Sequence, residues 1–157
     1  MKLHRGFTLI ELLITVAILA MLAGGAMTFA DLAVKRTQEQ ELRTSLRQIR
    51  EAIDAYKAAA DGKRIARASD ESGYPPDLAS LTKGVPDITD PKRERKVYFL
   101  RRLPRDPTAD PAEPPEATWG LRSYESDPAD PQPGRDVFDV YSRSTATSLG
   151  GRPYREW

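Results

Sequence analysis

The apolar run from Phe7 to Ala30 constrains this chain more than any other feature, because only Glu11 interrupts it with a charge. As a helix it would measure about 36 Å, which is enough to span a bilayer. Lys2 and Arg5 precede the run, and the positive-inside rule then leaves the start of the chain in the cytoplasm. A secretory signal peptide is the alternative, but its apolar stretch is normally shorter. We therefore expect a membrane-spanning half of a helix over residues 7–30.

Glu11 is the informative residue within that run. A carboxylate inside a membrane costs about 2.5–3.5 kcal/mol on insertion scales and usually has a partner. The run contains no basic side chain. Cleavage between Gly6 and Phe7 would expose an α-amine at Phe7 that is largely cationic at neutral pH. In a stack of staggered helices, Glu11 of one copy can meet the Phe7 amine of its neighbour. The alternative is a glutamate that snorkels or is protonated by itself.

The stretch Arg5–Leu13, with the sequence RGFTLIELL, resembles the processing signature of type IV pilins and type II secretion pseudopilins. This resemblance implies that residues 1–6 are a prepilin leader peptide. It also implies that a prepilin peptidase cuts after Gly6 and methylates Phe7. In that family the glutamate at the position of Glu11 is needed for assembly.

A second helical segment follows, since residues 35–60 contain neither proline nor glycine. Its apolar residues recur in steps of four and three, which predicts one continuous helical face. We expect residues 31–61 to form the amphipathic half of a long helix that ends at Asp61 and Gly62. Its core face should pack on the globular part of the same subunit, with coiled-coil pairing as the alternative. That face consists of Leu42, Leu46, Ile49, Ile53 and Tyr56.

The neighbouring face of the same segment is rich in arginine. Acids stand four residues from three of the arginines, a spacing that allows weak pairs within a helix. DNA binding is an alternative reading, but the net charge of +1 argues against a dominant polyanion partner, and we expect no nucleic acid. A solvated or subunit-contacting face is favoured. The predicted pairs are Glu39–Arg43, Arg47–Glu51 and Arg50–Asp54.

The remaining residues, 62–157, contain all 13 prolines and form the predicted globular domain. Their pattern predicts a short helix over 75–81 and two strands over 119–124 and 137–142, separated by a proline-rich loop. The basic run 92–96 is interpreted as a solvated loop. The expected fold is α+β and pilin-like, with a long N-terminal helix packed on a small C-terminal antiparallel sheet.

Two later motifs resemble the major pseudopilin family of type II secretion, general secretion pathway protein G. They are Tyr98–Pro107, with the sequence YFLRRLPRDP, and Asp136–Ser142, with the sequence DVFDVYS. The resemblance implies a helical homopolymer that grows through the periplasm and drives export of folded proteins across the outer membrane. Implied partners are further copies, minor pseudopilins, an inner-membrane assembly platform and membrane lipid. A minor pseudopilin and a type IV pilus subunit for adhesion, motility or DNA uptake are the alternatives.

Catalysis is not expected from this chain. Its only histidine, His4, precedes the predicted cut, and it has no cysteine. Ser-His-Asp triads, Cys-His pairs and histidine-based zinc sites are thereby excluded for a mature chain. A secreted hydrolase that uses carboxylates alone is the remote alternative.

No metal or other cofactor is predicted either. The resembled family commonly holds calcium in the loop after the last strand, but here Arg143–Gly151 lacks any carboxylate. Gathering of a cation by Asp127, Asp130 and Asp136 is the alternative to a solvated acidic loop. Packing of the last aromatic residues, Tyr154 and Trp157, is expected to hold the carboxyl terminus instead.

Overall fold

The computed structural model describes residues 7–157, with the side chains of residues 23–28 outside that description. The predicted leader, residues 1–6, therefore lies outside the described residues. The chain divides into two compact units, Met1–Thr37 and Gln38–Trp157, which are called unit 1 and unit 2 below and are each described by themselves. Helix α1, Leu9–Asp61, belongs in part to each.

Helix α1 begins and ends where its local chemistry changes. Thr8 caps its start, because the Thr8 Oγ1 accepts a hydrogen bond from the backbone N–H of Glu11 at 3.3 Å. The helix then runs for 53 residues without a proline. At its other end Gly62 donates to the Ala58 carbonyl, and Lys63 takes a left-handed conformation with φ 54° that turns the chain away.

Across the described part of the chain, no helix is both long and apolar enough to cross a membrane. The predicted span, residues 7–30, contains residues 23–28, whose side chains lie outside the description. The membrane-spanning half of the helix is therefore not confirmed here and stays a prediction.

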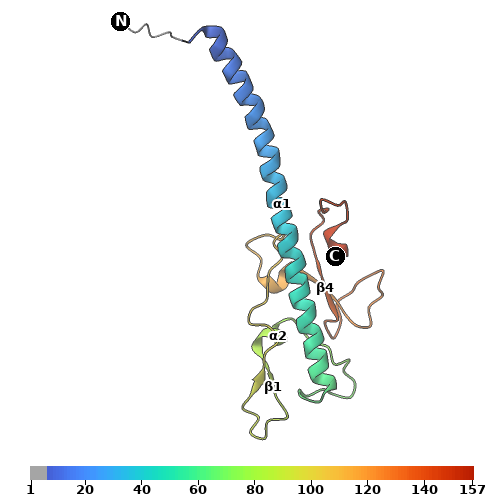
Figure 1. The fold of residues 1–157 in the computed structure, drawn as a ribbon. Helices are drawn as coiled ribbons and strands as arrows, with labels where there is room; N and C mark the ends of the chain where they lie inside the picture. Colours follow the sequence, from blue (N-terminus) through green and yellow to red (C-terminus); the bar gives the residue numbers. More distant parts are fainter. Residues whose placement is uncertain (1–6) are drawn as a thin grey trace. The chain divides into compact units, whose positions relative to one another are not determined.

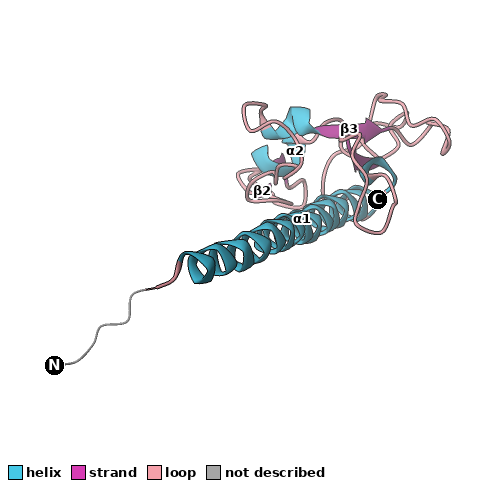
Figure 2. Ribbon diagram, turned by 90° about the horizontal axis from the view of Figure 1, so that it is seen from above, coloured by secondary structure: helices cyan, strands magenta, loops and turns pink. Residues whose placement is uncertain are grey.

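Unit 2 builds an α+β domain on residues 38–61 of α1, which confirms the predicted fold class. Short elements and connecting loops cover one side of this helical segment (Figure 2). The elements are α2 (Ala79–Lys83), β1 (Val85–Pro86), β2 (Lys96–Val97), η1 (Pro115–Thr118), β3 (Trp119–Arg122), β4 (Asp139–Ser142) and η2 (Tyr154–Glu156). They form two antiparallel pairs, β1 with β2 and β3 with β4.

The core of unit 2 forms around the apolar face of α1. All five residues of the predicted face are buried, from Leu42 at 0% exposure to Tyr56 at 8%. The covering side chains come from far along the sequence, and they include Leu81, Trp119, Val137, Val140 and Tyr154. Each fully buried leucine or isoleucine contributes about 1.5–3 kcal/mol. Because the chain itself covers this face, the coiled-coil alternative has no apolar seam to use.

Three predicted elements differ in their bounds from the observed ones. The short helix starts at Ala79 and not at residue 75, because Asp77 accepts a hydrogen bond from the Ser80 N–H at 2.7 Å and so holds a turn there. Strand β4 starts at Asp139, two residues after its predicted start, because the Val137 N–H donates to the Pro75 carbonyl at 2.8 Å and not to β3. Strand β3 ends at Arg122 because the next N–H, that of Ser123, donates to Gln132.

The β3–β4 pair contains a glycine that no other residue can replace without displacement. Gly120 lies opposite Tyr141 in the antiparallel register. A Cβ atom added at Gly120 would lie 2.3 Å from two carbon atoms of the Tyr141 ring. The ring thus covers the glycine backbone, as aromatic residues commonly do opposite strand glycines.

We expect Gly120→Ala to lower the free energy of unfolding by about 1–3 kcal/mol, because the half-buried Tyr141 ring that covers Gly120 must shift. Thermal unfolding of the full chain in detergent, followed by circular dichroism, measures the change. Gly150→Ala is the matched control, since the nearest atom to its added Cβ is the Ser148 Oγ at 3.8 Å. Equal melting temperatures for the two variants would contradict this account of the strand pair.

Candidate assembly site

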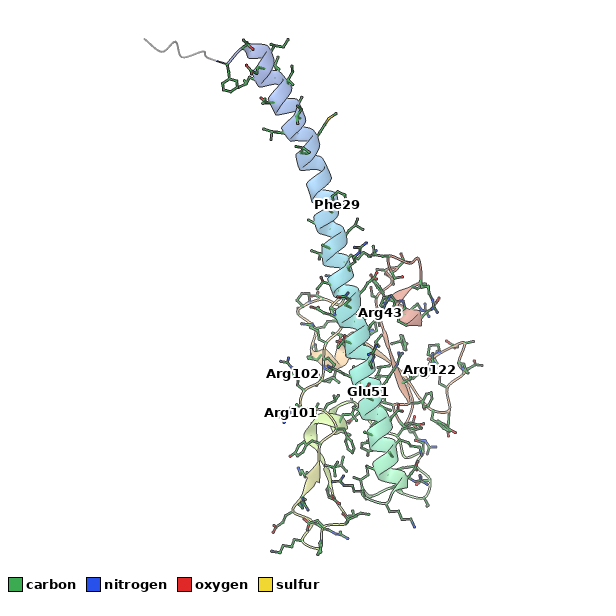
Figure 3. All side chains as sticks on the ribbon, viewed as in Figure 1. Phe29, Arg43, Glu51, Arg101, Arg102 and Arg122 are labelled. Carbon is green, nitrogen blue, oxygen red and sulfur yellow. The ribbon has the colours of Figure 1, made fainter. Side chains whose placement is uncertain are left out.

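The first turns of α1 expose apolar side chains on every face. Phe7 precedes the helix and is 77% exposed. Phe29, labelled in Figure 3, is 74% exposed. A helix that is apolar all round requires an apolar environment, which lipid or the helices of other copies can supply. The other exposed large apolar residues of this segment include Leu9, Ile10, Leu12, Leu13, Ile14, Val16, Ile18, Leu19, Met21 and Leu22.

Glu11 is the one acid among these apolar residues, and it lies one helical turn beyond Phe7. Its backbone N–H is satisfied by Thr8, and its side chain is exposed. Among the described residues its carboxylate takes part in no ion pair. Gly6, the residue at the predicted cut, lies outside the described residues, so processing stays a prediction.

A second feature, which we call the carboxyl-terminal clasp, holds the segment 139–157 on α1. Glu39 is only 8% exposed. One of its carboxylate oxygens accepts hydrogen bonds from the Leu149 N–H at 2.6 Å and from the Tyr154 hydroxyl at 3.2 Å. Burial, followed by the negative charge of Glu39, raises the pKa of Tyr154 above its ordinary value. The Tyr154 hydroxyl therefore stays a donor across the physiological range.

Arg50 forms the other half of the clasp. Its Nε donates to Asp139 at 2.7 Å, and one terminal nitrogen donates to the main-chain oxygens of Val140 and Trp157 at 3.0 and 2.7 Å. The Trp157 ring lies 4.4 Å from the Arg43 guanidinium and meets the Tyr154 ring edge-on at 5.1 Å. Figure 3 shows Arg43 beside this segment. Tyr154 and Trp157 thus pack as the sequence suggested.

The predicted pairs along the arginine face of α1 are wrong. Among the ion pairs of residues 7–157, none joins Glu39 to Arg43, Arg47 to Glu51 or Arg50 to Asp54. Glu39 and Arg50 bind the carboxyl-terminal segment instead. A partly buried contact across the fold offers these groups hydrogen bonds that an exposed neighbour four residues away does not.

Two aspartates of the later motifs hold loops together. The carboxylate of Asp106 is buried and accepts hydrogen bonds from Ser142 at 2.5 Å and from the Thr108 N–H at 2.7 Å. Asp136 accepts from the Ser72 and Ser123 hydroxyls and from the Tyr124 N–H. Although burial raises the pKa of Asp136, these hydrogen bonds outweigh it and leave that pKa below its ordinary value.

The cation site considered for Asp127, Asp130 and Asp136 does not form. Asp127 and Asp130 accept hydrogen bonds within their own loop, from the Ala129 N–H and the Gln132 amide. Within residues 7–157, no three metal-binding side chains come together.

A known family signature matches the N-terminal segment. The family signature described as a prokaryotic N-terminal methylation motif matches residues 1–27. This is the motif of type IV pilin-like proteins, and the α+β fold with its long N-terminal helix is consistent with theirs.

A particular relative agrees with that class. The chain is 28% identical over 153 residues to type II secretion system core protein G of Vibrio cholerae serotype O1. The match covers 96% of this chain and 87% of the relative. No solved structure matches the chain. These similarities support a type II secretion pseudopilin or a type IV pilin-like role.

Removing the Arg50 guanidinium tests the clasp. We expect Arg50→Met to lower the free energy of unfolding by about 1–3 kcal/mol, because one substitution removes hydrogen bonds to three residues. Arg47→Met, on the exposed side of the same helix, is the matched control. Proteolysis of the folded chain with mass analysis should show faster loss of the last residues in Arg50→Met alone. Equal stability and equal cleavage in both variants would contradict the clasp.

Proposed function

We propose that this chain is the structural subunit of a type II secretion pseudopilus, cut after Gly6 and polymerised into a periplasmic fibre. The observation that supports this most strongly is a methylation motif over residues 1–27 whose apolar segment contains Glu11 as its lone acid. The similarity to a type II secretion core protein over most of both chains supports the same role. The role is mechanical, and no catalytic step is assigned to the chain.

Assembly follows from charge and solvent. After cleavage, the Phe7 amine is a cation at the start of α1, and Glu11 lies one turn along. The Glu11 carboxylate lies near the N-terminus of α1, where the helix dipole places a partial positive charge. That charge stabilises the ionised carboxylate. When a new copy enters the fibre, its Glu11 docks on the Phe7 amine of its neighbour. In an apolar surrounding this pair is attracted strongly, and it fixes the stagger between copies.

The location follows from the same features. The chain is anchored in the bacterial inner membrane by residues 7–30, with its start in the cytoplasm and unit 2 in the periplasm. Its partners are prepilin peptidase, minor pseudopilins and an assembly platform in the inner membrane. Growth of the fibre pushes folded proteins toward an outer-membrane channel. A type IV pilus subunit is the second candidate, since the methylation motif is shared by that class.

Processing is expected to be visible in the intact mass of the protein from its native membrane. The mass should lack residues 1–6 and carry one added methyl group, because the peptidase cuts after Gly6 and methylates Phe7. Loss of residues 1–30 would instead identify an ordinary signal peptide. A protein that still began at Met1 would remove the cationic partner for Glu11 and with it the assembly mechanism.

Replacement of Glu11 separates assembly from insertion. We expect Glu11→Ala to abolish fibres in a secretion-competent host, while the chain still enters the membrane, because the apolar segment itself is unchanged. Sheared fibres and membrane fractions, each probed with antibody, measure the two outcomes. Asp31→Ala is the matched control and should retain fibres. Normal fibres from Glu11→Ala would show that the charge pair is not needed.

A further inference from the structure

Two exposed loops at opposite ends of unit 2 carry opposite charge. The first, called the basic hairpin, is Lys92–Lys96, which follows β1 and ends at the first residue of β2, and it has three net positive charges. The second, called the acidic loop, is the segment 108–117 before β3, and it has three net negative charges. All of their charged side chains are exposed, and none forms an ion pair within residues 7–157.

The basic hairpin is held in shape by an acid. One Asp90 carboxylate oxygen accepts the Lys92 N–H at 3.2 Å, and the other accepts the N–H groups of Glu94 and Arg95 at 3.2 and 3.0 Å. Arg93 takes a left-handed conformation with φ 51° inside this turn. The hairpin therefore uses its backbone to fold and leaves its cationic side chains directed outward.

The acidic loop is held in shape by a base. The Arg105 guanidinium donates to three main-chain carbonyls of the loop, those of Asp110 and Glu113 at 2.6 Å each and that of Pro111 at 2.8 Å. The loop is thus held by hydrogen bonds to its backbone carbonyls, and the carboxylates of Asp110, Glu113 and Glu116 are left exposed. Both loops are thus ordered before a partner arrives, which removes much of the entropic cost of binding.

The positions of the two loops suit a head-to-tail contact. The basic hairpin lies at the Asp61 end of α1, where Ile65 forms a bridge with Asp87 and Arg64 bonds the Asp87 carboxylate. The acidic loop lies toward the other end of unit 2, on the same side of the helix (Figure 1). Copies stacked along the helix direction bring the hairpin of one toward the acidic loop of the next.

We infer that the basic hairpin of each copy docks on the acidic loop of the adjacent copy along the fibre. Equal and opposite charges on one chain, at opposite ends of one domain, make the chain complementary to another copy of itself. A nucleic acid or an anionic lipid would satisfy the hairpin and leave the acidic loop without a partner. The contact rests on the proposed function, and it sets the axial register between globular domains through long-range attraction.

Charge reversal in the full chain tests the contact. We expect Lys92→Glu with Arg95→Glu to reduce fibre yield about tenfold in a secretion-competent host, because like charges then face each other. Reversal of the acidic loop, Asp110→Lys with Glu113→Lys, should do the same. Combining all four substitutions should restore the yield to within about threefold of the unaltered chain, since opposite charges face each other again.

The matched control is Arg135→Glu with Arg155→Glu, which changes the net charge equally at exposed positions outside both loops. Unfolding temperatures of all variants should agree, since the altered side chains are exposed and the turns are held by Asp90 and Arg105. If the hairpin variant assembles as well as this control, the docking inference is overturned. If the hairpin variant loses assembly and the variant with all four substitutions does not regain it, the proposed pairing of the two loops is likewise overturned.

Disulfide trapping gives an independent test, because the natural chain contains no cysteine. Fibres with both Lys92→Cys and Glu113→Cys should oxidise to ladders of linked copies, whereas fibres with either cysteine alone should not. Fibres without ladders would contradict the contact. A hairpin variant that assembles normally but no longer binds DNA or anionic vesicles would show that the hairpin serves a polyanion.

These outcomes separate the contact from the function on which it rests. If the unaltered chain forms fibres and Glu11→Ala does not, the proposed function stands, whatever the hairpin variants do. If the unaltered chain forms no fibre where type II secretion is active, the proposed function fails and the docking contact fails with it.

Discussion

Burial of one apolar stripe on α1 is the interaction on which unit 2 depends. The short strands of this domain have few hydrogen bonds of their own, because each pair contains at most four residues a strand. Strand pairs of this length are only marginally stable by themselves in water. They persist because their inward side chains, such as Trp119 and Val140, lie on the same stripe that Leu42 and Ile49 present. The helix therefore supplies the surface on which the remaining chain takes its shape.

Polar groups beside that stripe determine how the chain lies on it. Apolar contacts have little directional preference, whereas a buried carboxylate or guanidinium must find hydrogen-bond partners in a defined geometry. Glu39 and Arg50 lie along the same edge of the apolar stripe and bind main-chain groups of the final segment. Their hydrogen bonds give the carboxyl-terminal residues one position on α1. In the resembled family a calcium ion is expected in the loop after the last strand, and here the clasp orders this part of the chain.

The sequence predicted those features that depend on regular spacing. The helical face from Leu42 to Tyr56 could be found because side chains three and four residues apart share one face. The two longer strands could be found from their apolar and aromatic residues, to within two residues at their ends. The partners of Glu39 and Arg50 could not be found, because 89 to 115 residues separate the groups that meet. The hairpin of β1 and β2 has only two paired residues a strand, which leaves no periodic pattern to read.

The clasp has a consequence for the order in which the molecule matures. Arg50 is made long before its partner Trp157, which follows 107 positions later. Until the last residues emerge, the stripe on α1 is incompletely covered and two charged groups lack their final hydrogen bonds. Contacts at such long separation slow folding, since a large loop must close first. Products of interrupted synthesis that lack residues 139–157 would leave part of the stripe open to proteases.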